Sequence, residues 1–128
     1  MSRQSWSEFF LSFEGRVGRR RFWLHYILLL LLPAVILAVI IDVMTGHTDD
    51  NGPGMLVYLV ILWPSLAVQV KRWHDRDKSG WWILISLIPI LGGIWAFVET
   101  GFLPGTPGPN RFGPNPDEAQ QAIPSALQ

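Results

Sequence analysis

The sequence predicts an all-α integral membrane protein, a helical bundle of three transmembrane helices with an amphipathic interfacial helix before them. Three observations carry this prediction. The 128-residue chain is 49% hydrophobic and 16% charged, whereas charged residues make up about a quarter of a typical soluble domain. It holds three long apolar runs. Its lysines and arginines lie in clusters beside these runs, with none between positions 22 and 70, a distribution typical of membrane proteins.

Length and composition also limit the organisation and the function. We expect one membrane domain, residues 1–116, followed by a mobile polar tail, residues 117–128. A formal net charge of zero argues against a general nucleic-acid binder. The chain has no cysteine, which excludes disulfides and thiolate metal sites. We therefore expect no metal, no cofactor and no nucleic-acid partner.

The N-terminal segment carries an aromatic stripe. Trp6, Phe9, Phe10 and Phe13 follow the spacing i, i+3, i+4, i+7, which places all four side chains on one face of a short helix. Such a helix can lie in the membrane interface, or its aromatic face can pack against the protein's own helices. The sequence leaves both interpretations open.

Residues 22–41 form the first predicted span. This run has no formal charge, and 20 residues at about 1.5 Å each reach about 30 Å, the thickness of the hydrocarbon core of a bilayer. A cluster of arginines precedes it, so we expect the chain to enter the membrane here. Residues 42–53 are rich in acidic residues and glycine and contain no lysine or arginine, which predicts a loop.

Residues 55–73 form the second predicted span. The run is uninterruptedly apolar or uncharged only as far as Val70. It is long enough to cross if the side chains of Lys71 and Arg72 reach back to the headgroups.

Residues 81–98 form the third predicted span, which Pro89 and a glycine pair at positions 92–93 interrupt. We expect a single kinked helix, because each half is too short to cross a bilayer alone. The alternative is a re-entrant hairpin made of two half-helices.

The distribution of lysine and arginine predicts the orientation. Five of these residues lie before the first span, none in the first loop, four in the turn between the second and third spans, and one in the tail. The positive-inside rule therefore places the N-terminus and the turn in the cytoplasm, and the acidic loop and the tail outside.

The turn at residues 71–82 is the most polar stretch between the apolar runs. Its neighbours His74 and Asp75 suggest an acid–base pair, but adjacent residues on a helix do not face each other, and no second histidine lies at metal-ligand spacing. We therefore predict no catalytic residue and favour a tight connection between antiparallel helices, with Lys71 and Asp75 as i, i+4 partners. Binding of anionic headgroups or of a protein partner is the second interpretation, since each cation near anionic lipid contributes about 1 kcal/mol.

Three motifs occur in a fixed order along the chain. They are Phe13-x-Gly15-Arg16-x-x-Arg19-x-x-Phe22-Trp23, Arg72-x-His74-Asp75-x-x-x-Ser79-Gly80-Trp81 and Gly108-x-Asn110-Arg111-Phe112-Gly113-Pro114-x-Pro116. Together they resemble the small bacterial inner-membrane proteins grouped as domain of unknown function 805, over residues 5–116. Lys71 stands where that family usually has arginine, and Asn115 where it usually has aspartate. The resemblance implies a multi-span architecture and a bacterial inner-membrane location, and it supplies no activity and no catalytic residue.

The third motif is too particular for a linker. Asn110 can form a local turn, Arg111 offers five hydrogen-bond donors, and Phe112 and Gly113 follow directly. If this tail motif works with the other two, it must lie on their side of the membrane. Three full spans place it on the opposite side, whereas a re-entrant third segment brings it back.

The predicted function is that of a small multi-span inner-membrane protein that binds anionic lipid headgroups or a protein partner through a basic cytoplasmic face. The alternative is a small transporter or channel subunit that uses proline-broken helices. An enzyme is the least favoured class. The expected partners are membrane lipids and a second copy of the chain or another membrane protein. The predicted binding residues, besides the tail motif, are Arg16, Arg19, Arg20, Lys71, Arg72, His74, Asp75, Arg76, Ser79 and Trp81.

Overall fold

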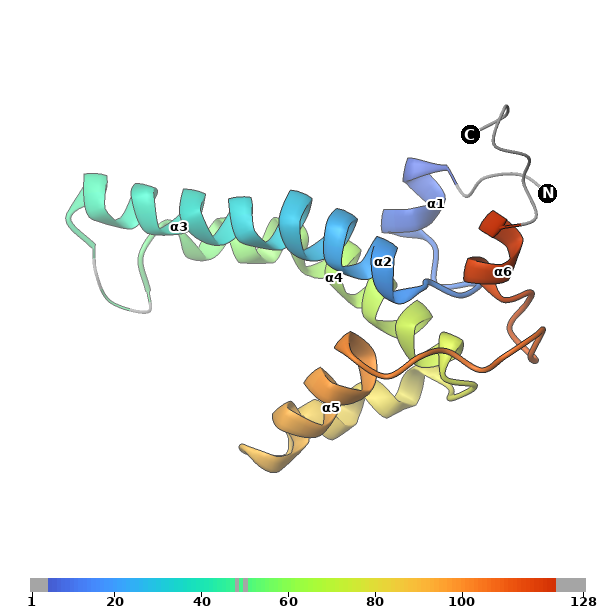
Figure 1. Ribbon diagram of the computed structural model, residues 1–128. Helices are drawn as coiled ribbons and strands as arrows, with labels where there is room; N and C mark the ends of the chain where they lie inside the picture. Colours follow the sequence, from blue (N-terminus) through green and yellow to red (C-terminus); the bar gives the residue numbers. More distant parts are fainter. Residues whose placement is uncertain (1–4, 48, 50, 122–128) are drawn as a thin grey trace.

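The computed structural model describes residues 5–47, 49 and 51–121, and these residues are mainly helical (Figure 1). Within them, an isolated bridge between Asn110 and Gly113 is the only β feature, so the predicted all-α class is confirmed. In chain order the helices are α1 (Trp6–Leu11), α2 (Arg19–Arg21), η1 (Phe22–Leu31), α3 (Leu32–Thr45), α4 (Met55–Asp75), η2 (Gly80–Leu87), α5 (Leu91–Gly101) and α6 (Pro116–Gln121).

The first apolar run belongs to one long helix. The segments α2, η1 and α3 join without a break over Arg19–Thr45, a length of 27 residues. The π-helical turns of η1 end just before Pro33, which has no backbone N–H and therefore interrupts the α-helical hydrogen bonding. Gly46 ends the helix in the left-handed conformation, with φ at 75°. The predicted helix at residues 22–41 is thus confirmed, and it extends further at both ends.

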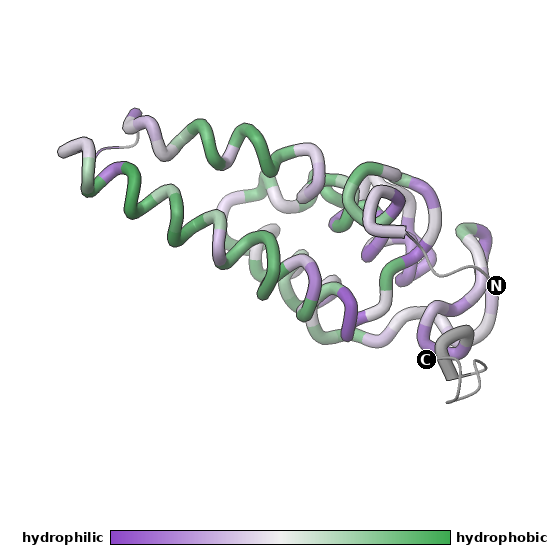
Figure 2. The backbone as a smooth tube through the Cα atoms, turned by 90° about the horizontal axis from the view of Figure 1, so that it is seen from above, coloured by the Kyte–Doolittle hydropathy of each residue, from purple (hydrophilic) through white to green (hydrophobic). Residues whose placement is uncertain are grey.

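The second helix of membrane-spanning length is α4, which has 21 residues and runs back beside α3 (Figure 1). Both long helices are apolar enough to cross a membrane, and only 11% and 22% of their apolar windows are buried inside the protein. Figure 2 shows hydrophobic residues along both helices and many hydrophilic residues at the end that carries α1. The exposed apolar side chains of the two helices are suited to contact lipid acyl chains.

The third apolar run doubles back on itself. The 3-10 helix η2 has 8 residues and ends at an extended Ile88, and α5 then returns against η2 (Figure 1). Pro89 explains the break, because a residue before proline is driven out of the helical conformation and proline has no N–H to donate. At about 2.0 Å per residue, η2 reaches about 16 Å, roughly half of the hydrocarbon core. The single kinked span that we expected over residues 81–98 is therefore wrong, and the hairpin alternative describes this segment.

Gly92 allows the two arms of the hairpin to meet. A Cβ atom added at Gly92 would lie 1.8 Å from the carbonyl oxygen of Ile85, so only glycine fits this approach of backbone to backbone. At the tip, Ile90 has φ at 65°, a conformation that β-branched residues rarely adopt. The hairpin diverges from the α3–α4 pair in Figure 1, and its tip points away from α1.

The short helix α1 packs against the rest of the protein. Phe9 is fully buried in the core cluster, whose other members are Val17, Phe22, Tyr26 and Val68. The packing interpretation of the aromatic stripe is thereby confirmed for Phe9. Trp6 is 59% exposed, so the interfacial interpretation still applies to that side chain.

The chain after α5 returns to the end that carries α1. Residues 102–115, called the strap below, have no regular helix or strand, and α6 follows them (Figure 1). The strap is hydrogen-bonded to the end of α4, where Thr106 N donates to Asp75 O at 2.8 Å. The expectation that the tail lies opposite the basic turn is therefore wrong, because the third segment turns back. Of the predicted mobile tail, residues 117–121 belong to α6 and residues 122–128 lie outside the described residues.

Candidate functional site

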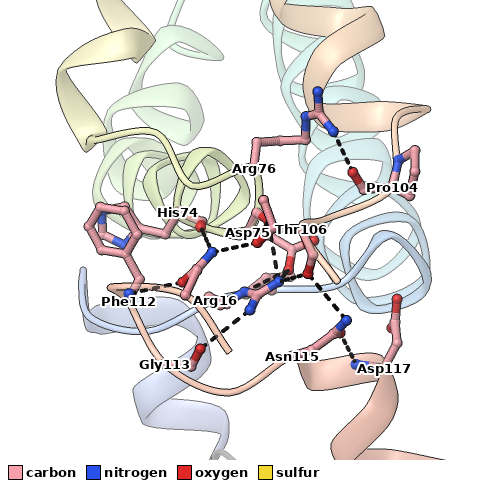
Figure 3. Close-up of polar contacts among 12 residues, drawn as sticks. Arg16, His74, Asp75, Arg76, Pro104, Thr106, Phe112, Gly113, Asn115 and Asp117 are labelled. Carbon is pink, nitrogen blue, oxygen red and sulfur yellow. Dashed lines mark hydrogen bonds and ion pairs between the residues drawn. The ribbon is translucent and has the colours of Figure 1, made fainter. Parts of the chain in front are cut away.

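Arg16 joins the three sequence motifs (Figure 3). Its Nε donates to Asp75 Oδ1 at 3.0 Å. Its Nη1 donates to the carbonyl oxygens of Gly108 and Gly113 at 2.8 and 3.3 Å, and its Nη2 donates to Thr106 O at 2.7 Å. One guanidinium group, presented by the loop after α1, therefore binds the end of α4 and the strap at the same time.

Asp75 is the centre of a buried ion cluster. One carboxylate oxygen accepts from Arg16 and the other from Arg72, which lies one turn earlier on α4. The exposed fractions are 1% for Asp75, 0% for Arg72 and 6% for Arg16. The expected pair of Lys71 with Asp75 is wrong, because α1 offers two carbonyl oxygens to which Lys71 Nζ donates instead. The i, i+3 partner Arg72 takes its place.

Positive charge is in excess in this cluster. Arg16, Lys71 and Arg72 are all buried, but the cluster holds one carboxylate, that of Asp75, and it pairs with the two arginines only. The other buried carboxylate among the described residues, Glu99, is bound to different cations. Burying a charge without a counter-charge lowers the stability of a protein by roughly several kcal/mol, unless polar groups replace its hydration. Backbone carbonyl groups must therefore replace much of the lost hydration of these cations.

Those carbonyl groups come largely from the strap and the end of α5. The residues of the strap are half-buried or exposed, and an irregular segment has no ladder of backbone hydrogen bonds, so the carbonyl groups that it turns toward the protein need donors from side chains. Arginines from three segments supply them, and we call Arg16, Arg19, Arg72 and Arg76 the arginine cage. Besides the bonds of Arg16, the cage bonds run from Arg72 to Thr100 O and Leu103 O, from Arg19 to Phe102 O and from Arg76 to Pro104 O. Trp23 Nε1 adds a bond to Gly101 O at 2.7 Å.

The tail motif closes on His74. Asn110 Nδ2 donates to His74 O at 2.9 Å, and Asn110 Oδ1 accepts from Phe112 N at 2.9 Å, which forms a local turn. The Phe112 ring stacks on the imidazole (Figure 3). His74 Nδ1 lies 2.9 Å from Gly15 O, in the first motif. The imidazole and the Asp75 carboxylate thus have different partners, and they do not form an acid–base pair.

Exposed cations and aromatic side chains surround the buried cluster. Arg111 pairs with Asp77 at 3.3 Å, with 62% and 45% of the two side chains exposed. Arg19 and Arg20 are exposed at the start of the first long helix, and Trp81 is 78% exposed at the start of the hairpin. This rim is the part of the site that a lipid or a partner can reach without a structural change.

Glu99 forms a second ion cluster where the hairpin ends. It pairs with Lys78 and, at 3.5 Å, with Arg76. Burial acts to raise the pKa of Glu99, but the hydrogen bonds and charges of Lys78 and Arg76 together outweigh it and hold the pKa below its ordinary value. Ser79, next to Lys78, is the N-cap residue of η2 and makes no side-chain capping bond. Glu99 is not among the residues predicted from the sequence, although a signal exists there, since it is the first charged residue after the third apolar run.

The structure brings the three motifs together and divides the predicted binding residues into two kinds. Among the described residues no group of three or more histidine and acidic side chains could hold a metal ion. The buried predicted residues are Arg16, Lys71, Arg72, His74 and Asp75. The exposed or half-buried ones are Arg19, Arg20, Arg76, Ser79, Trp81, Asn110, Arg111, Phe112 and Gly113.

These features define a small helical membrane protein with two helices long enough to cross a bilayer and a polar cluster at one end. The chain belongs to the family described as protein of unknown function (DUF805), which matches residues 10–114. The resemblance found in the three motifs is thereby confirmed.

Relatives in Escherichia coli (strain K12) cover most of the chain. The inner membrane protein YhaH is 38% identical over 110 residues, which are 84% of this chain and 88% of that protein. The inner membrane protein YhaI is 32% identical over 108 residues, 84% of this chain and 87% of the relative. The uncharacterized protein YiiR is 30% identical over 141 residues, and the match covers 88% of this chain and 89% of that protein. No solved structure matches the chain. The names of the first two relatives support an inner-membrane location.

Proposed function

We propose that the protein crosses the inner membrane twice, keeps its basic end in the cytoplasm, and binds anionic lipid headgroups at that end. Two observations support the two crossings: two helices have membrane-spanning length, and the third apolar segment is a hairpin. The clusters of lysine and arginine support the orientation through the positive-inside rule. The whole strap then lies on the cytoplasmic side.

The headgroup proposal depends on which cations a lipid can reach. The donors of Arg16 and Arg72 are occupied by Asp75 and by backbone carbonyl groups, so these two residues hold the protein together. The observation that carries the proposal is the exposure of Arg19 and Arg20 at the point where the first long helix begins. Cations at this depth attract anionic lipid by about 1 kcal/mol each.

Lipid retention tests this function. The protein would be placed in nanodiscs that contain equal amounts of phosphatidylglycerol and phosphatidylcholine, and the lipids that stay bound after release would be counted by native mass spectrometry. We expect more phosphatidylglycerol than phosphatidylcholine for the wild type. Arg20→Gln should lower that ratio about fivefold, the effect of one lost charge.

A charge-conserving variant is the control. Arg20→Lys keeps the cation and should keep the ratio, whereas a loss caused by altered packing would lower the ratio in both variants. An unchanged ratio in Arg20→Gln would overturn the role of this cation, and an absence of any preference in the wild type would overturn headgroup binding as a whole. In that outcome a protein partner becomes the leading occupant of the basic end. The transporter or channel alternative and homo-oligomerisation stay predictions of the sequence.

A further inference from the structure

The strap is held by side chains and not by a regular backbone ladder. Its fixed points are the arginine cage, the bonds of Asn110 and the stack of Phe112 on His74. Its outermost tie is the exposed ion pair of Arg111 with Asp77. Exposed ion pairs contribute little to stability, so this tie is the easiest one to break.

The strap offers the arginine cage only neutral carbonyl oxygens, which are weaker acceptors than anionic oxygens. Besides its ion pair with Asp75, Arg16 uses Nη1 and Nη2 on neutral carbonyl oxygens of the strap, at Thr106, Gly108 and Gly113. Guanidinium groups bind carboxylate or phosphate oxygens more strongly than neutral carbonyl groups, and in a bidentate geometry. The excess of buried cations over carboxylates increases the advantage of an anion. Chemically, the strap therefore occupies an arginine cluster that suits a phosphate group.

We propose that the strap is a built-in competitor for anionic headgroups: a lipid phosphate replaces the strap carbonyl groups on Arg16 and Arg19, and the strap swings out. This inference rests on the headgroup function proposed above and adds regulation to it. In the closed state lipid reaches only the rim, including the exposed Arg19, whose Nη1 stays bonded to Phe102 O. In the open state the arginine cage faces the headgroup layer, and the strap with its tail motif is released toward the cytoplasm.

The distance between the strap and the first motif reports this exchange. The chain has no cysteine, so Glu14→Cys and Pro109→Cys introduce two unique labelling positions, both exposed. Spin labels on the two cysteines would be measured by pulsed electron resonance in nanodiscs of phosphatidylcholine, of phosphatidylglycerol, and of phosphatidylcholine with added inorganic phosphate. We expect a second, longer distance in phosphatidylglycerol. If the longer distance appears with inorganic phosphate as well, free phosphate is also a ligand of the cage. One unchanged distance in all three conditions overturns the proposal.

The variant Arg111→Gln separates the proposal from a role of Arg111 as a simple surface cation, because the two roles predict opposite changes in lipid retention. Loss of the tie to Asp77 should raise the open fraction in phosphatidylglycerol about two- to fivefold, with more lipid retained. If Arg111 acted only as a binding cation, its loss would lower retention and leave the distances unchanged. Arg111→Lys keeps the charge and serves as the matched control. A failure of the headgroup function would instead appear as a wild type without phosphatidylglycerol preference, so the two failures are distinguishable.

Discussion

The Nε atom of Arg16 lies 3.0 Å from Oδ1 of Asp75, a contact between residues 59 positions apart in the chain. The same carboxylate also binds Arg72, so it is the counter-charge between two buried guanidinium groups. The loop after α1, the end of α4 and, through Arg16, the strap are all connected at this point. The integrity of the basic end should therefore depend on this one side chain.

Replacing Asp75 by asparagine should be severely destabilising. The variant leaves Arg16 and Arg72 buried without their carboxylate, and the loss of one partner of a buried ion pair costs about 3–5 kcal/mol. Thermal unfolding of the purified protein in detergent would measure the effect. Asp77→Asn is the matched control, because it removes a carboxylate from an exposed pair and should cost about 0–1 kcal/mol. Equal melting temperatures for the two variants would contradict the buried cluster.

The two neighbouring glycines of the hairpin should respond differently to alanine. At Gly92 a Cβ atom would collide with the backbone of η2, whereas at Gly93 nothing lies within 4 Å. We expect Gly92→Ala to separate the arms of the hairpin and lower the melting temperature. Gly93→Ala should be neutral or stabilising, since alanine favours a helix over glycine by about 1 kcal/mol. Similar behaviour of both variants would show that the arms do not touch at this point.

The Glu99 cluster should make stability depend on pH on the acid side. Because the pKa of Glu99 is lowered in the folded protein, its ion pairs stabilise the protein fully above the ordinary carboxyl pKa. This contribution is lost as the pH falls through the lowered pKa. Melting temperatures of wild type and Glu99→Gln, measured from neutral pH downward, should differ most at neutral pH and converge in acid. A constant difference would assign the effect of the substitution to packing.

The side of the C-terminus tests the hairpin in living cells. A reporter that is active only in the cytoplasm, fused after Gln128, should be active. A reporter of the same kind inserted after Gly46, at the end of the first long helix, should be silent. A periplasmic C-terminus would require the third segment to cross fully, and the contacts between the strap and α4 would then be impossible.

Much of the fold follows from local properties of the sequence. The helix that contains residues 22–41 was predictable, because the length of an apolar run is a local property. Pro89 indicated a break in the third apolar run. Whether the two halves form one kinked helix or a hairpin depends on the contact of Gly92 with Ile85. That approach is tertiary, and no spacing in the sequence encodes it.

The arrangement of the candidate site was harder to predict from the sequence than the helices were. Arg16 and Arg72 were predicted as binding residues together with the exposed cations. The local sequence does not distinguish a buried arginine from an exposed one. Their partners are a carboxylate and a set of backbone carbonyl groups, and carbonyl groups have no sequence signature. The resemblance to a family showed that three motifs occur together. Only the structure shows that the first two motifs hold the backbone that leads to the third.

If the protein crosses the membrane twice, as proposed, the short hairpin gives the molecule an uneven cross-section in the bilayer. Because η2 is about 16 Å long, η2 and α5 would then take up room in one leaflet only, while the two long helices would pass through both. Four helical segments then displace lipid in the leaflet next to the basic end, and two do so in the other. A body of this wedge shape fits best where that leaflet is expanded. Membrane curvature, and not headgroup charge alone, should therefore influence where the protein gathers.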